Sequence, residues 1–390
     1  MNKKKINVLL SLILASSMGM ACSNIAIQTD TNTIVGRTLD FEENTGNVFG
    51  MGRVGDVNHT RMNVHPVAHS LTWTNRYDFV GQTGMNNPNI IDGINAKGLY
   101  AGFFYLPGIT QYPQYNQAKA KPALGVFDVV NYVLGEASSV PNAIHLLNNV
   151  QMVENAIALA PNTQPGVYGI MPMHILLRDQ AGHSAVIEFI KGQAHITQNI
   201  GPVLTNSPSI EWQRHNAAQY NYVRTNNTQK RYDGLYMNGS GFDGIPGDWT
   251  PPGRFARATQ VIKHFPKSFN DTQATLVARQ ALSVVEVPLG VNPSPTLWES
   301  MANLKANTYS FRPMLHVVDQ EKHVFDIDAQ SQGGWQTVSL LDLVKRDSIP
   351  SGWLHAILGP SYPVTKVERL MQPTQGPASS APNPVFNQSS

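Results

Sequence analysis

The stretch Met20-Ala21-Cys22-Ser23-Asn24-Ile25-Ala26-Ile27 sets the architecture of this chain, because it contains Cys22, the only cysteine among 390 residues. Three lysines occupy positions 3–5, and residues 6–15 (INVLLSLILA) are almost wholly apolar. Small residues lie at the −3 and −1 positions of a cleavage site after Ala21. This order is typical of a secretory signal peptide. We therefore predict that residues 1–21 are removed and that Cys22 becomes the first residue of the mature chain.

A cysteine at a free N-terminus carries a thiol and an α-amino group on one residue. A free thiol titrates near a pKa of about 8.5 and a free α-amine near about 7.7–8.0, so each is only partly in its reactive form at neutral pH. The amine can accept the thiol proton without a distant base. The sequence therefore predicts a hydrolase whose N-terminal residue supplies both nucleophile and base.

Three other interpretations of Cys22 compete with this one. A lipoprotein signal also ends before a cysteine, but it normally carries Leu at −3, where this chain has Gly19. A lone cysteine can also be incidental. A disulfide within the chain would need a second cysteine, and the sequence has none. The apolar run of roughly 10 residues is shorter than the ~20 that a membrane span needs, which favours cleavage.

Composition argues against several classes of partner. The formal net charge of the whole chain is +2. Removal of the signal takes three lysines and no acids, and so leaves −1. No Lys/Arg-rich run points to a nucleic acid. Although His65 and His69 are four residues apart, Pro66 between them breaks the helical context of a zinc site. We expect no metal and no cofactor, and the selective lack of other cysteines suits a thiol that stays free.

Alternating polar and apolar residues predict strands at 23–29 and 33–41, joined by a turn near residue 31. A hairpin closing there would place Cys22 opposite Asp40 and Arg37 opposite Ile25. Because residues 37 and 40 are an odd number apart, a regular strand points them to opposite faces. Both reach Cys22 only if the strand bulges, for example at Gly36, or ends before Asp40.

Further patterns complete an α+β organisation in one domain, residues 22–371. A disordered Pro/Ser/Asn-rich tail follows at 372–390, and a Gly/Pro-rich loop at 238–253 has the length of a functional loop. A four-layer α-β-β-α sandwich fits this order of elements. The other predicted strands are 88–94, 99–106, 173–178, 184–190, 193–197, 308–318 and 323–328, and the predicted helices are 124–136, 141–150, 209–222, 254–265 and 271–283.

Five motifs, taken in order, resemble the choloylglycine hydrolase family of bile salt hydrolases and penicillin V acylases. They are Cys22-Ser23-Asn24, Gly36-Arg37-Thr38-Leu39-Asp40-Phe41, Asp92-Gly93-Ile94-Asn95-Ala96-Lys97-Gly98-Leu99, Leu204-Thr205-Asn206-Ser207-Pro208 and Thr250-Pro251-Pro252-Gly253-Arg254-Phe255. The resemblance spans roughly residues 22–330. It implies an N-terminal-nucleophile hydrolase with an α-β-β-α fold that cleaves linear amide bonds.

The resemblance also implies roles for individual residues. Cys22 resembles the nucleophile, Asn206 the donor to the oxyanion, and Arg254 the distal arginine of the family. Tyr105 lies where bile salt hydrolases tend to have Asn and penicillin V acylases tend to have Tyr. The catalytic residues that it implies are Cys22, Arg37, Asp40, Tyr105, Asn206 and Arg254.

The substrate is predicted to be a small acyl amide. Leu39, Phe103 and Phe104, together with Tyr105, suggest an apolar pocket for the acyl group. A signal-bearing member of this kind resembles periplasmic penicillin V acylases of Gram-negative bacteria, some of which cleave N-acyl homoserine lactones. We expect a periplasmic or secreted enzyme with no membrane span, and assembly into a homo-oligomer is compatible with this. The alternatives are a conjugated bile salt hydrolase and a non-catalytic, lipid-anchored binding protein.

Overall fold

The computed structural model describes most of the chain between residues 21 and 345. The described residues are 21–42, 49–62, 67–84, 89–158, 168–226, 230–232, 235–237, 241–266, 270–319, 324–327, 335–345 and 368–369. The predicted signal before Ala21 and the predicted tail at 372–390 lie outside the described residues, as does most of the segment between residue 345 and that tail.

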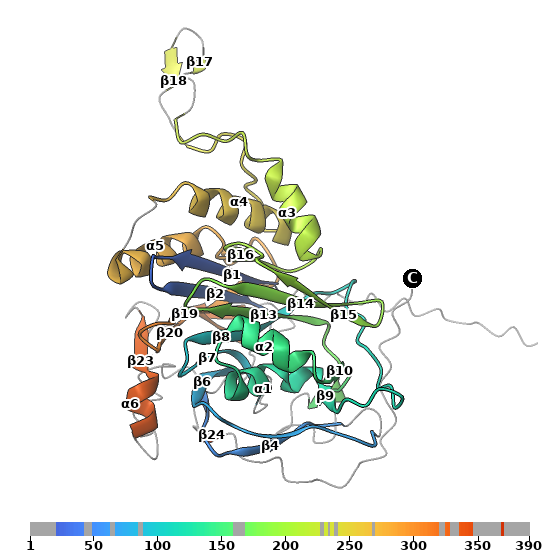
Figure 1. Ribbon diagram of the computed structural model, residues 1–390. Helices are drawn as coiled ribbons and strands as arrows, with labels where there is room; N and C mark the ends of the chain where they lie inside the picture. The colour runs from blue at the N-terminus through green and yellow to red at the C-terminus, as the bar shows by residue number, and fades with distance from the viewer. Residues whose placement is uncertain are drawn as a thin grey trace, which may run out of the picture.

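Two sheets form the centre of the molecule and helices cover both outer faces (Figure 1). The six-stranded sheet has the order β16 (Val203–Leu204), β1 (Ala21–Gln28), β2 (Thr33–Asp40), β19 (Thr296–Asn303), β20 (Thr308–Pro313) and β23 (Gln336–Ser339) within the described residues. The eight-stranded sheet has the order β15 (Gln193–Gln198), β14 (Ser184–Ile190), β13 (Met173–Asp179), β8 (Leu99–Tyr105), β7 (Ile90–Asn95), β6 (Phe79–Thr83), β3 (Phe49–Gly52) and β24 (Glu368–Arg369) in the same part of the chain.

The helices complete the four layers, which confirms the predicted α-β-β-α sandwich. Those over the six-stranded sheet are α3 (Ile210–Ala218), α4 (Pro251–Lys263) and α5 (Asp271–Ser283), and those over the eight-stranded sheet are α1 (Val129–Glu136) and α2 (Val140–Leu147) (Figure 1). The smaller elements are β4 (Val57–His59), β5 (Thr72–Thr74), β9 (Ala123–Gly125), η1 (Val126–Asp128), β10 (Gln151–Val153), β11 (Ile157–Ala158), β12 (Tyr168–Gly169), β17 (Lys230–Tyr232), β18 (Leu235–Met237), β21 (Leu315–Asp319), β22 (Val324–Ile327) and α6 (Leu340–Lys345).

The β1–β2 hairpin is present, but its predicted register is wrong by one residue. Cys22 pairs with Leu39, and Asp40 pairs with Ala21. The cause is the turn, in which the Thr29 N–H donates to the Asn32 carbonyl at 2.9 Å and leaves a two-residue loop between the strands.

This register places Cys22 and Arg37 on the same face of the sheet. That face looks toward the eight-stranded sheet, because Arg37 contacts the Ile91 carbonyl there. Asp40 points to the opposite face, where α4 packs. β2 pairs regularly with β1 throughout, so the bulge considered at Gly36 is absent from this pairing. Gly36 instead permits close packing, since a Cβ there would lie 3.0 Å from Leu282 Cδ1 on α5.

Local signals explain where the helices begin. Thr250 caps α4 by accepting from the Gly253 N–H, and Pro251 and Pro252 occupy its first turn, so the helix starts before the predicted residue 254. α5 begins with a capping box between Asn270 and Gln273 and matches the predicted 271–283.

Other boundaries differ from the prediction where tertiary pairing intervenes. The predicted helix 124–136 starts only at Val129, because Ala123–Gly125 pairs with β10. The predicted strand 308–318 is divided between β20 and β21. β19, the strand between β2 and β20, is missing from the prediction.

Candidate active site

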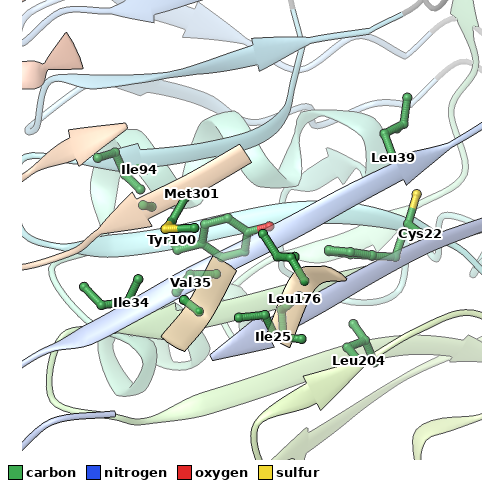
Figure 2. Close-up of a cluster of buried hydrophobic side chains, with 14 of the residues drawn as sticks. Cys22, Ile25, Ile34, Val35, Leu39, Ile94, Tyr100, Leu176, Leu204 and Met301 are labelled. Carbon is green, nitrogen blue, oxygen red and sulfur yellow. The ribbon is translucent and has the colours of Figure 1, made fainter. Parts of the chain in front are cut away.

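Cys22 lies near the start of β1, beside Leu39 at the same end of the two paired strands (Figure 2). Its backbone N–H donates to Asn206 Oδ1 at 2.7 Å. Its Sγ lies 3.6 Å from Arg37 Nη2, and an Asp40 backbone hydrogen bond also reaches the thiol. Burial raises the pKa of the Cys22 thiol, whereas Arg37 opposes that rise. The nitrogen is a peptide N–H here because Ala21 precedes it.

Arg37 is fixed between the two sheets by contacts of its two terminal nitrogens and by aromatic rings packed against its guanidinium. Nη1 donates to the Ile91 carbonyl at 2.5 Å and lies 3.6 Å from Asp92 Oδ1. The guanidinium carbon lies 4.4 Å from the centre of the Phe104 ring and 5.4 Å from that of Trp298. These contacts hold Nη2 toward the thiol.

Arg254 joins the helical layer to the same site. Its Nη2 donates to Asn206 Oδ1 at 3.0 Å, and its Nη1 lies 3.2 Å from Asp40 Oδ2 and also donates to Ser23 Oγ. The Trp249 carbonyl accepts from Nε at 3.0 Å. Arg254 is completely buried, so its charge acts in a region with little water to screen it.

Asp40 reaches the site from the helix-facing side of β2. Thr296 Oγ1 donates to Asp40 Oδ1 at 2.6 Å. Burial raises the pKa of Asp40 to about 6, although Arg254 and the hydrogen bond from Thr296 pull it down. The Asp40 carboxylate thus pairs with Arg254 and raises the pKa of the Cys22 thiol, whereas the hydrogen bond between the Asp40 backbone and the thiol lowers that pKa.

Asn206 connects Cys22 to the end of β8. Its Nδ2 donates to the Tyr105 carbonyl at 2.8 Å. In the β8–β13 pairing, the Leu106 N–H donates to the Pro172 carbonyl. Because successive residues of a strand point their polar groups to opposite sides, the Tyr105 N–H and carbonyl both point away from β13, toward Asn206. The Asn206 side-chain amide and the Tyr105 backbone N–H therefore lie on the same side of β8, and that amide also binds the Cys22 N–H.

The structure gathers Cys22 with all five other predicted catalytic residues. Among the predicted acyl-binding residues, Leu39 lies beside Cys22, and Phe104 is buried against Arg37. Phe103 points to the other face of β8 and packs 6.0 Å from the Phe127 ring, centre to centre. It belongs to the core beneath the eight-stranded sheet, so the structure does not bring Phe103 to the thiol.

Two parts of the site have no role in the sequence-based prediction. Asp92, quoted only as part of a motif, pairs with Arg37. Thr296 and Trp298 lie on the unpredicted β19 and contact Asp40 and Arg37, respectively. For Asp92 the available signal was an acidic residue within a predicted, largely apolar strand. The sequence of β19 lacks a clear alternation of polar and apolar residues, so it offered no such signal.

The described part of the chain shows neither a cluster of metal ligands nor a helix that could span a membrane. Its His, Cys, Asp and Glu residues form no group of three suited to a metal ion. Its helices are too short or too polar to cross a bilayer.

Comparison with known proteins adds to this geometry. The family model described as "Linear amide C-N hydrolases, choloylglycine hydrolase family" matches residues 22–326. A bile salt hydrolase/transferase from Clostridium perfringens is 28% identical, over 64% of this chain and 74% of its own. A penicillin V acylase from Pectobacterium atrosepticum is 26% identical, over 91% of this chain and 94% of its own.

Solved structures share the fold. A mutant conjugated bile acid hydrolase from Clostridium perfringens has a TM-score of 0.62 and 23% identity, covering 75% of this chain and 89% of its own. Penicillin V acylase from Agrobacterium tumefaciens has a TM-score of 0.59 and 23% identity, covering 75% of this chain and 83% of its own. At these identities the two structures support the architecture only.

Proposed function

Since the chain belongs to the choloylglycine hydrolase family of linear amide C–N hydrolases, we propose that it cleaves small acyl amides with Cys22 as nucleophile. The observation that carries this proposal is the position of Asn206, whose amide contacts both the Cys22 N–H and the Tyr105 carbonyl. Cleavage after Ala21 would convert that N–H into an α-amine held at the same point. The amine then takes the thiol proton as the sulfur attacks the carbonyl carbon.

The oxyanion that forms is stabilised by Asn206 Nδ2 and the Tyr105 backbone N–H. Both are held in place before the substrate arrives, so they cost no reorganisation during the reaction. Arg37 and Arg254 favour the thiolate from opposite faces of the sheet. The α-amine returns its proton to the leaving amine, and water then hydrolyses the thioester.

An apolar acyl group suits the surroundings of the thiol. Three half-buried side chains pack against two hydrophobic clusters, one that contains Cys22 and one that contains Phe103. They are Ile91, Tyr105 and Met171. The Ile91 backbone carbonyl accepts from Arg37, and the Tyr105 backbone carbonyl accepts from Asn206. The side chains of Ile91 and Tyr105 therefore begin close to the reacting atoms. We propose penicillin V-like or N-acyl homoserine lactone-like amides as substrates, in line with the penicillin V acylase that aligns with most of this chain.

A second candidate is hydrolysis of conjugated bile salts. The similarity to the bile salt hydrolase/transferase of Clostridium perfringens favours it. Tyr105, in place of the Asn that such enzymes tend to have, favours the first candidate. For either substrate we propose action in the periplasm or outside the cell, which rests on the signal-like sequence before Cys22.

The test is to export the full chain and measure its intact mass before and after iodoacetamide. We expect a mass that begins at Cys22, one alkylation, and loss of hydrolysis upon alkylation. Rates on penicillin V, a long-chain acyl homoserine lactone and glycine-conjugated bile salts then rank the substrates. A mass that shows an acylated or blocked Cys22 would mean that the free α-amine is missing, and this result would overturn the mechanism.

A further inference from the structure

Asp92 is a fully buried carboxylate that both sheets hold in place. The Tyr100 hydroxyl, on the neighbouring strand β8, donates to Oδ1. From the six-stranded sheet, Ser300 Oγ donates to Oδ2 at 2.5 Å and the Tyr309 hydroxyl donates to the same oxygen. Three neutral donors therefore stabilise the charge of Asp92, in addition to its ion pair with Arg37.

The guanidinium of Arg37 lies between this carboxylate and the nucleophile. Nη1 is 3.6 Å from Asp92 Oδ1, and Nη2 is 3.6 Å from Cys22 Sγ. In a buried region the interaction between charges is only weakly screened, so a thiolate and a carboxylate compete for the same cation. Asp92 thus lowers the positive potential that Arg37 presents to the sulfur.

We propose that Asp92 is a positioning residue that holds the Arg37 guanidinium against the Cys22 thiol and withholds part of its positive charge from the sulfur. The proposal rests on the proposed function, in which that thiol is the nucleophile. Its benefit is chemical: the intrinsic reactivity of a thiolate falls as the pKa of its thiol falls. An Arg37 without its counter-charge would give more thiolate, but a less reactive one.

Other charged and titratable groups also face this network. Tyr100 and Tyr309 contact Asp92 directly, and Arg178 on β13 interacts with Tyr100. On the helix-facing side, Asp40 and Arg254 act on the thiol. A variant at position 92 leaves all of these groups in place, so a change in the behaviour of the thiol reports on Asp92.

The decisive variant is Asp92→Asn, which keeps an acceptor for the hydroxyls but removes the charge. The rate of iodoacetamide alkylation is measured against pH in the mature protein, where Cys22 is the sole thiol. We expect the midpoint to move to lower pH by about one unit, or roughly tenfold more thiolate below the midpoint. A folded variant whose midpoint is unchanged or higher would overturn the proposal.

Asp128→Asn is the matched control. Asp128 is also a buried acid with several donors, including Thr60 and Arg61, but it lies in the helical layer beyond the eight-stranded sheet. We expect its alkylation midpoint to equal that of the wild type. A shift equal to that of Asp92→Asn would show a general effect of unpaired buried groups and would count against the proposal.

Tyr309→Phe tests the same relationship if Asp92→Asn does not fold. With one donor fewer, the carboxylate depends more on Arg37, so the midpoint should rise by a smaller amount. An unchanged midpoint in this variant would overturn the proposal. Alkylation does not require turnover, so these results stand even if alkylated wild-type protein still hydrolyses amides, an outcome that would refute only the function.

Discussion

Arg254 Nη2 donates to Asn206 Oδ1 at 3.0 Å, on the same oxygen that accepts the Cys22 N–H at 2.7 Å. A helix of the outer layer therefore orients the amide beside Cys22. With its oxygen engaged twice, the amide has only its Nδ2 hydrogens to offer, one of which binds the Tyr105 carbonyl. Within the described part of the chain the remaining hydrogen has no partner, so it can serve an oxyanion.

Replacing Asn206 separates its two proposed tasks, which are to orient Cys22 through Oδ1 and to donate to the oxyanion through Nδ2. Asn206→Asp keeps an oxygen for Cys22 and Arg254 but has no hydrogen to donate, and Asn206→Ala has neither. We expect both to lower kcat on penicillin V by about 10²–10³, with a smaller change in KM. Gln213→Ala, which removes a contact to the backbone carbonyl of Asn206, should lower kcat less. Wild-type kcat in Asn206→Asp would mean that the amide only orients the nucleophile.

The pair Arg254–Asp40 should be strongly coupled, because both side chains are completely buried. Removing one partner leaves an uncompensated charge, so Arg254→Met and Asp40→Asn should each lower the free energy of unfolding by about 3–5 kcal/mol. The double variant should lose less than the sum, by at least about 0.5 kcal/mol. Urea unfolding of all four proteins measures the coupling, and simple additivity would refute it.

Stability should depend on pH through Asp40. Burial raises its pKa to about 6 in the folded chain, against about 3.9 when unfolded. Between these values the folded chain binds more protons, so the free energy of unfolding should fall as pH rises from about 4 to about 6, by about 3 kcal/mol at most. Asp40→Asn should flatten this slope in urea unfolding at pH 4, 5, 6 and 7. Equal slopes in the variant and wild type would contradict the assignment.

The sequence predicted the hairpin that carries Cys22, but not its register. Alternation located both strands, whereas the register depended on whether the turn used an even or odd number of residues. That single residue decides that Arg37, and not Asp40, shares a face with Cys22. Motifs nevertheless identified both residues, because a motif needs no knowledge of side-chain direction.

Interactions between distant strands were beyond the sequence-based prediction. β19 carries Glu299 and Ser300 at buried positions, so its pattern resembles neither a half-exposed strand nor a purely apolar one. Its Ser300 is a partner of Asp92, 208 residues away in the chain. Phe103 and Phe104 are adjacent in sequence and equally apolar, and only the sheet shows which of them faces Arg37.

The cap of α4 should matter for catalysis as well as for stability. Thr250 Oγ1 accepts from the Gly253 N–H at 3.3 Å, one residue before Arg254. Ser139 caps α2 with the same geometry, accepting from the Asn142 N–H at 3.3 Å, in the layer beyond the other sheet. Thr250→Ala and Ser139→Ala should each lower the free energy of unfolding by about 1 kcal/mol.

Only Thr250→Ala should change the active site, because the first turn of α4 holds Arg254 against Asp40 and Asn206. We expect it to raise the alkylation midpoint of Cys22, since a loosened cation favours the thiolate less, and to lower kcat several-fold. Ser139→Ala should leave both quantities at their wild-type values. Equal kcat in the two variants would show that the cap contributes to folding alone, and that Arg254 keeps its place through its contacts with Ser23 and Trp249.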